Sequence, residues 1–174
     1  MTISLYDASV LSYLQTLDAA KGFLQKGLDW AKANGVDPEE LVEARLCGDM
    51  HPFRFQVQQV VFHSTGAIEA MRKGVLEFGG PRPQHDYAGL QTAVAEAAET
   101  LRALNPAEVN ALAGAEVAFR VPNKEDRVFT AEGFLLSFSL PNFHFHATTA
   151  YGILRMKGVP IGKLDFMGAL RLKG

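Results

Sequence analysis

Histidines are the residues of this chain best suited to acid–base or metal chemistry, because a neutral imidazole can move protons and bind metals near neutral pH. Five are present. His51 and His85 stand next to helix starts, and we expect both to be exposed loop residues. His63 and His146 each lie on the flank of an apolar stripe in a predicted helix, so they could meet inside a bundle. His144 points about 160° away from His146 on an intact helix, so these two cannot share one site.

A pocket between the second and fourth predicted long helices is the functional site that these positions favour. Its expected lining is Gln56, His63, Asn142, His146 and Tyr151. Asn142, His146 and Thr149 share one helical flank and bring more hydrogen-bonding groups than a core usually tolerates. We therefore expect a small-molecule binder or an enzyme. In the alternative interpretation, His63 and His146 are buried polar residues hydrogen-bonded across the bundle.

A metal site is not favoured by the histidine spacing. Stable zinc sites take three or four protein ligands, and two histidines four residues apart on one helix commonly supply two of them. Here Thr148 stands four residues after His144, and Ala150 stands four residues after His146. We expect no metal or other cofactor; a metal, if bound, would be held by His63 and His146.

Apolar residues that recur near every 3.6 positions predict four long helices. These span residues 5–33, 53–78, 87–104 and 131–157. At 37–38 and 105–106, a helix-capping residue is followed by proline, which predicts the start of a short connecting helix at each place. Alternating apolar residues around a polar turn predict a β-hairpin over 116–130. Pro141 is expected to kink or break the last helix. The expected fold is all-α, one domain over residues 1–174, with four bundled helices, short helical connectors and the small hairpin.

Two apolar features lie outside these helical stripes. Phe55 and Phe62 stand seven residues apart on nearly the opposite face of the second helix, which predicts a homodimer interface. The alternative is that the hairpin or the C-terminal tail covers them. In the tail, residues 159–174, glycine and proline oppose a helix, but apolar side chains are present. We expect it to pack on the bundle as an ordered extended segment.

Composition argues against several protein classes. The formal net charge of −2 gives no basic surface for nucleic acid. No apolar run approaches the ~18 residues of a membrane span, and the N-terminus has no signal-peptide pattern. The single cysteine, Cys47, allows no intrachain disulfide, so a cytoplasmic location is expected, and Cys47 itself is expected to be buried. Phosphate-binding loops, nucleophile elbows and metalloprotease motifs do not occur.

Several segments resemble one protein family. They are SLYDASV near the start, ARL and DM ahead of Pro52, QVQ at 56–58 and LPNFHFHATTAYGILRMKGVPIGKLDFMG at 140–168. From Ser4 to Gly168 the chain is similar to an uncharacterised domain-of-unknown-function family within the DinB/YfiT-like metalloenzyme superfamily. The resemblance implies a DinB-like four-helix bundle, often dimeric, in a bacterial cytosol.

The resemblance also implies alternatives for function. Members of the superfamily typically bind a divalent metal through one histidine of the second long helix and two of the last, and some are thiol-dependent transferases or isomerases. His63 and His146 match two of these places, but Ala150 stands at the third. A divalent-metal-dependent transferase or isomerase is therefore one alternative, which Ala150 argues against. A non-catalytic dimeric interaction or stress-response module is the other, and a solid apolar core between the two helices would favour it.

Overall fold

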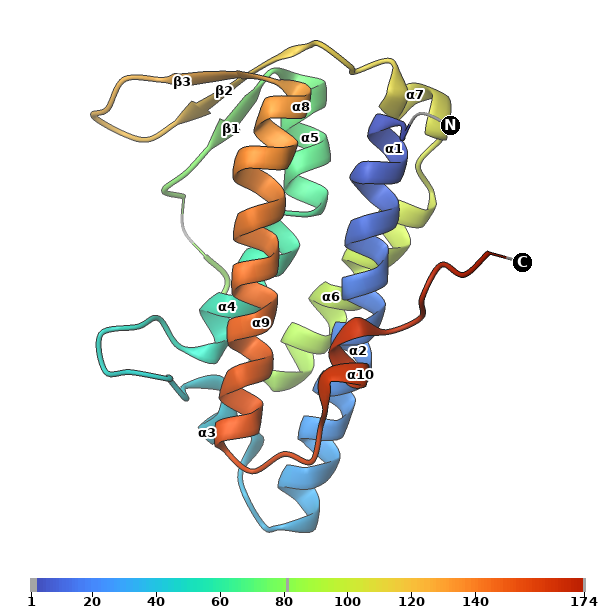
Figure 1. Cartoon of the computed structure of the whole chain (residues 1–174). Coiled ribbons are helices and arrows are strands. Elements are labelled where there is room, and N and C mark those ends of the chain that lie inside the picture. The colour runs from blue at the N-terminus through green and yellow to red at the C-terminus, as the bar shows by residue number, and fades with distance from the viewer. Residues whose placement is uncertain (1–2, 81, 174) are drawn as a thin grey trace.

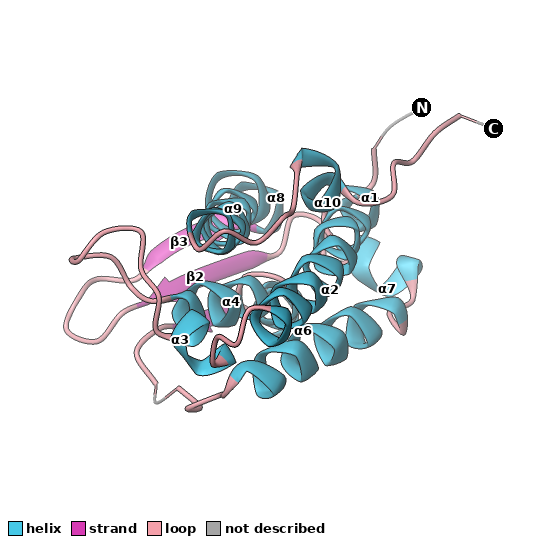
Figure 2. Ribbon diagram, turned by 90° about the horizontal axis from the view of Figure 1, so that it is seen from below, coloured by secondary structure: helices cyan, strands magenta, loops and turns pink. Residues whose placement is uncertain are grey.

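Long helical rods lie side by side and form most of the molecule (Figures 1 and 2). The computed structural model describes residues 3–80 and 82–173. The rods contain α2 (Val10–Ala33), α4 (Phe53–Phe62), α6 (Tyr87–Arg102) and α9 (Leu140–Met156). Helices α2 and α4 each pack against both α6 and α9. Within the described ranges, no helix has the length and apolar character needed to cross a membrane.

Short polar side chains begin most of the helices, as the sequence predicts. Backbone N–H groups of the first helical turn donate to the side chains of Ser4, Asp37, Asp86, Asn105 and Thr130. The connectors α3 (Pro38–Val42) and α7 (Pro106–Asn110) follow two of these caps. The predicted helix 5–33 is divided into α1 (Leu5–Ala8) and α2 at Ser9, whose hydroxyl donates to a backbone carbonyl of α1.

The predicted second helix, residues 53–78, is wrong in its later part. After α4, Ser64 leaves helical geometry with φ −109° and ψ −81°, and its hydroxyl donates to backbone carbonyls of the turn before it. Helix α5 (Thr65–Lys73) then ends at Gly74, whose φ of +75° suits glycine. Val75–Glu77 forms strand β1.

A three-stranded sheet lies at one end of the rods, against α5 and α8 (Ala131–Phe134) (Figure 1). The predicted hairpin is present as the antiparallel strands β2 (Glu116–Arg120) and β3 (Arg127–Thr130). Strand β1 joins the other edge of β2 in parallel. The chain is therefore helical with a small mixed sheet, and the all-α prediction is wrong at β1, because a partner strand far along the chain is invisible to local periodicity.

The last rod is continuous, but it changes its helical geometry before Pro141. Helix α8 runs into a π-helical turn at Leu135–Ser139, and α9 follows (Figure 1). Pro141 has no N–H for the carbonyl four residues earlier, and its ring crowds that carbonyl. The wider π turn accommodates both problems. The predicted break at Pro141 therefore takes the form of a π turn in an unbroken rod.

The C-terminal tail packs along α2 (Figures 1 and 2). Gln15 donates from Nε2 to the carbonyl of Met167 at 2.9 Å, and the ammonium group of Lys26 lies 2.6 Å from the carboxylate of Asp165. The expected packing is thus confirmed as far as Gly168, whereas residues 169–173 are exposed. The expected extended conformation is wrong for α10 (Lys163–Met167), where Asp165 accepts a backbone bond at the helix start.

Gly168 is the point at which the tail comes closest to α2. Its φ of +62° and ψ of −152° suit only glycine, and an added Cβ would lie 3.1 Å from Gln15 O and 3.2 Å from Ala19 Cβ. We expect Gly168→Ala to destabilise tail docking by about 1–3 kcal/mol and to speed tryptic cleavage at Lys163. Gly162→Ala is the control, because its Cβ would meet nothing within 4 Å. Equal cleavage rates in the two variants would contradict this prediction.

Candidate functional site

The imidazoles of His63 and His146 form a buried pair between α4 and α9. His63 follows the last residue of α4, and His146 lies on the inner face of α9. Their ring centroids are 5.9 Å apart, and the ring planes are nearly parallel at 11°. The two residues are only 4% and 9% exposed. The structure thus brings together the two histidines that periodicity places on the flanks of different helices.

An aromatic shell surrounds this pair and keeps it uncharged. Phe62 and Phe138 lie beside His63, and Phe55 and Phe145 lie beside His146. Burial lowers the pKa of His63 to about 3, and the neighbouring His146 contributes further. The pKa of His146 is lowered to about 4, mainly by burial. The positive charge of Arg82, and then His51, lower it further. Both imidazoles are therefore neutral at neutral pH.

Gln56 determines the tautomer of His146. The amide Nε2 of Gln56 donates to the carbonyl oxygen of His51 at 2.9 Å, and its Oε1 lies 2.7 Å from Nδ1 of His146. An amide oxygen can only accept, so this network places the proton of His146 on Nδ1. Nε2 of His146 therefore keeps its lone pair and is a hydrogen-bond acceptor.

His63 has fewer hydrogen bonds than its burial would require. Its Nδ1 is enclosed, and no described residue offers it a hydrogen bond. An enclosed polar atom without a partner costs about 1–3 kcal/mol. The Nε2 atoms of His63 and His146 also lack partners within residues 3–80 and 82–173, but neither is fully enclosed. The two ring edges therefore carry unused hydrogen-bonding capacity that a ligand could reach.

Two hydrogen bonds in series hold the end of α4 in place. Ser139, the last residue of the π turn, donates from Oγ to the carbonyl oxygen of His63 at 2.7 Å. The hydroxyl of Tyr13, on α2, lies 2.7 Å from the same Oγ. Because the Ser139 proton points to the carbonyl, Tyr13 is the donor in this second bond. Both side chains are fully buried, and burial raises the pKa of Tyr13, so its hydroxyl stays protonated.

Asn142 is bound to the π turn and not to the histidines. Its Nδ2 donates to the carbonyl oxygen of Phe138 at 2.7 Å. That carbonyl lies in the stretch where the α-helical hydrogen-bond pattern is interrupted. The structure therefore gives Asn142 a local role in satisfying the backbone next to Pro141.

Tyr151 lies away from the other predicted lining residues. Its ring packs against Phe23 of α2 at 6.3 Å and against Phe166 of α10 at 5.7 Å, both edge-on. Five residues separate it from His146, which is about 140° around a helix. Of the predicted lining, the structure therefore groups Gln56, His63 and His146 and places Tyr151 elsewhere.

Predictions for the remaining histidines and the cysteine have mixed outcomes. His51 is exposed, as expected, and stacks on Phe55 with ring centroids 3.9 Å apart. His85 was expected to be exposed, but its Nδ1 is enclosed and has no partner among the described residues. His144 is exposed on the outer face of α9. Cys47 is exposed and not buried, because it lies in the irregular connection after α3.

Arg82 is a neighbour of this site that the sequence patterns did not reveal. Its guanidinium carbon lies 4.5 Å from the ring centroid of Phe55 and 5.1 Å from that of Phe78. Phe78 also packs edge-on against Phe62 at 6.2 Å. The segment that follows β1 thus packs on both phenylalanines, and among the described residues no ring of the hairpin or the tail contacts either of them. Arg82 follows two glycines outside any periodic element, so no helical or strand pattern could place it.

Buried side chains of α4 and α9 meet around the histidine pair. Clefts on the described residues include one beside α4, α5 and the segment after β1, one at the hairpin turn, and one between the N-terminal residues and α8. None of these three is lined by His63 or His146. The predicted place therefore holds a buried imidazole pair with unused hydrogen-bonding atoms, among apolar residues of both helices.

The donor atoms at the pair do not complete a metal site. Across residues 3–80 and 82–173, no three His, Cys, Asp or Glu side chains gather closely enough to hold an ion. Nδ1 of His146 is committed to Gln56, and the buried residue one turn later on α9 is Ala150. Two imidazoles are fewer than the three or four protein ligands of a zinc site.

The neutral pair predicts a loss of stability in acid. The pKa values of about 3 and 4 lie below the ordinary 6.5, so the unfolded chain binds more protons than the folded chain between pH 6.5 and about 4. Stability is complete above pH 6.5 and falls by roughly 2–3 kcal/mol per histidine as the pH drops to about 4.

Urea denaturation at each pH from 7 to 4 measures this effect. The slope of the unfolding free energy against pH reports how many more protons the unfolded chain binds than the folded chain. In His63→Leu this number should be smaller by about one, so the slope should be shallower. An unchanged slope in that variant would show that His63 is not buried and neutral in solution.

Comparisons with known proteins place the chain in context. Residues 5–167 match the model of a domain of unknown function, DUF1993. Among solved structures, the chain is similar to a DinB family member protein from Shewanella denitrificans, with 27% sequence identity and a TM-score of 0.80, over 98% of this chain and 95% of that chain. A search of curated proteins finds no match. The resemblance inferred from the sequence motifs is thereby confirmed.

Proposed function

The chain belongs to the DUF1993 family, a domain family of unknown function, and we propose that it is a cytoplasmic small-molecule-binding protein built on a DinB-like four-helix bundle. His63 and His146 would be its binding groups. Gln56 orients His146, and Ser139 fixes the backbone at His63. The observation that carries the proposal is the enclosed, unpartnered Nδ1 of His63 beside two open Nε2 edges.

A purely structural role would not require this arrangement. A leucine at position 63 would fill similar space without leaving a polar atom unsatisfied, at a saving of about 1–3 kcal/mol. Proteins commonly retain such costs at functional positions. Because Nε2 of His146 accepts and a neutral His63 carries one N–H, the pair can hold a group that both donates and accepts, such as a hydroxyl or an amide.

The lowered pKa values favour hydrogen bonding over proton abstraction. A general base works best when its pKa lies near the operating pH. His63 and His146, with pKa values of about 3 and 4, are weak bases at neutral pH. Their donor and acceptor roles nevertheless stay constant there, which suits orientation of an uncharged polar ligand.

Native mass spectrometry of protein purified under mild conditions tests this proposal. We expect a small-molecule adduct on the wild type and on His144→Ala, whose side chain is exposed on the same helix. The adduct should be absent from His63→Leu and His146→Leu. His63→Leu should also raise the unfolding free energy by about 1 kcal/mol, because the unpartnered nitrogen is removed. An adduct-free wild type together with a destabilised His63→Leu would refute a binding role.

The metal-dependent alternative leads to a separate prediction. With Ala150 in the third position, two imidazoles are too few to retain a divalent ion. We expect elemental analysis to find no stoichiometric zinc, nickel or iron, and we expect the melting temperature to stay unchanged in EDTA. About one ion per chain, lost in His63→Ala, would overturn this prediction and favour a metal-dependent enzyme.

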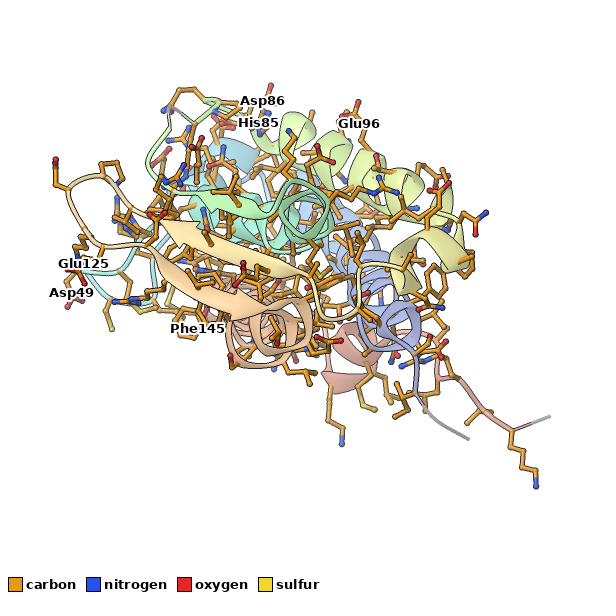
Figure 3. The ribbon with its side chains drawn as sticks, turned by 90° about the horizontal axis from the view of Figure 1, so that it is seen from above. Asp49, His85, Asp86, Glu96, Glu125 and Phe145 are labelled. Carbon is orange, nitrogen blue, oxygen red and sulfur yellow. The ribbon has the colours of Figure 1, made fainter. Side chains whose placement is uncertain are left out.

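The homodimer remains a prediction, and we now expect its interface at Phe145 on the last rod. Phe55 and Phe62 are partly buried within the chain, whereas Phe145 is 55% exposed. Figure 3 shows Phe145 at the edge of the molecule. We expect light scattering to give twice the 19.0 kDa chain mass and Phe145→Lys to shift the mass toward one chain. A wild-type particle of a single chain mass would exclude the dimer.

A further inference from the structure

A cleft of about 430 Å³ lies between α4, α5, α6 and the segment that follows β1. Its volume is in the range of small-molecule sites. The apolar part of its lining includes the rings of Phe62 and Phe78, which meet edge-on with centroids 6.2 Å apart. Neither His63 nor His146 lines this cleft, so it is distinct from the histidine pair.

Polar groups with unused hydrogen-bonding capacity also line the cleft. Gln59, a residue only 2% exposed, lines the cleft. His85 lies directly before α6 beside Asp86 (Figure 3), and its enclosed Nδ1 has no partner in residues 3–80 and 82–173. An apolar cleft with a few such polar groups is typical of a ligand site.

Arg82 gives the cleft a positive charge that no described acidic residue neutralises. Phe55 and Phe78 lie against its guanidinium group, and no ion pair joins it to a described residue. Partial burial lowers its pKa, although the group stays charged. Glu77 also lines the cleft, but its carboxylate lies 3.4 Å from the guanidinium group of Arg120 and forms an ion pair with it.

We propose that this cleft binds a small aromatic monocarboxylic acid, with its carboxylate on the N–H edge of Arg82 and its ring against Phe62 and Phe78. The planar guanidinium fork matches one carboxylate through two parallel hydrogen bonds. A dianion such as phosphate would face a single cation and the nearby charge of Glu77. Gln59 and His85 can bind a further polar substituent on the acid.

Calorimetry and amide NMR with benzoate test the proposal, with benzamide as the uncharged probe of similar shape. Benzoate should bind at least about tenfold more tightly than benzamide and shift the amides of Gly79 and Gly80. Arg82→Gln should weaken benzoate binding by about tenfold or more, and Arg82→Lys by less, because the charge remains and the fork is lost. Arg72→Gln is the matched control, since Arg72 pairs with Glu108 outside the cleft.

The outcomes separate this proposal from the histidine site. The proposal for the cleft is supported if His63→Leu still binds benzoate and Arg82→Gln does not. Both variants should melt cooperatively, which shows that they are folded. Equal affinity for benzoate and benzamide, or unchanged benzoate affinity in Arg82→Gln and Arg82→Lys, overturns it. Amide shifts confined to surfaces away from Phe62 and Phe78 would also overturn it.

Discussion

Two hydrogen bonds in series, from Tyr13 to Ser139 and from Ser139 to the carbonyl oxygen of His63, join three helical rods. At this junction, two of the three rods depart from α-helical geometry. Helix α4 has ended at this point, and the rod of α9 contains its π turn. Each departure leaves backbone groups that must find partners away from water. Ser139 meets one such need, and its position at the end of the π turn allows it to reach α4. The position of the His63 ring depends on this junction.

The partner of His146 determines the character of the imidazole pair. A carboxylate at the position of Gln56 would stabilise the protonated ring and raise its pKa, which would suit acid–base catalysis. The amide orients the ring equally well and leaves it uncharged. The aromatic shell acts in the same direction, because desolvation disfavours the imidazolium ion. Shell and amide together make the pair a hydrogen-bonding surface within a largely apolar core.

Local signals in the sequence were sufficient for most helices, since caps, prolines and 3.6-residue periodicity act within a few residues. They failed at Val75–Glu77, where pairing with a distant strand overrides helical pattern. Gln56, His63 and His146 were predictable because each lies on a helical flank. The bond of the Asn142 amide to the π turn was not predictable, because the turn itself was not foreseen. Arg82 and the buried nitrogen of His85 lie in an irregular segment, where only tertiary contacts determine which side chains meet.

The parallel pairing of β1 with β2 also bears on the order of folding. Val75 pairs with Ala118, 118 − 75 = 43 positions later, and α6 and α7 lie between them. Such non-local pairing requires closure of a long loop, so we expect it to follow formation of the intervening helices. The segment after β1 supplies one side of the cleft at Arg82. This cleft therefore belongs to a late-assembling part of the molecule, whereas the helical junction at His63 and Ser139 belongs to the core on which that part is built.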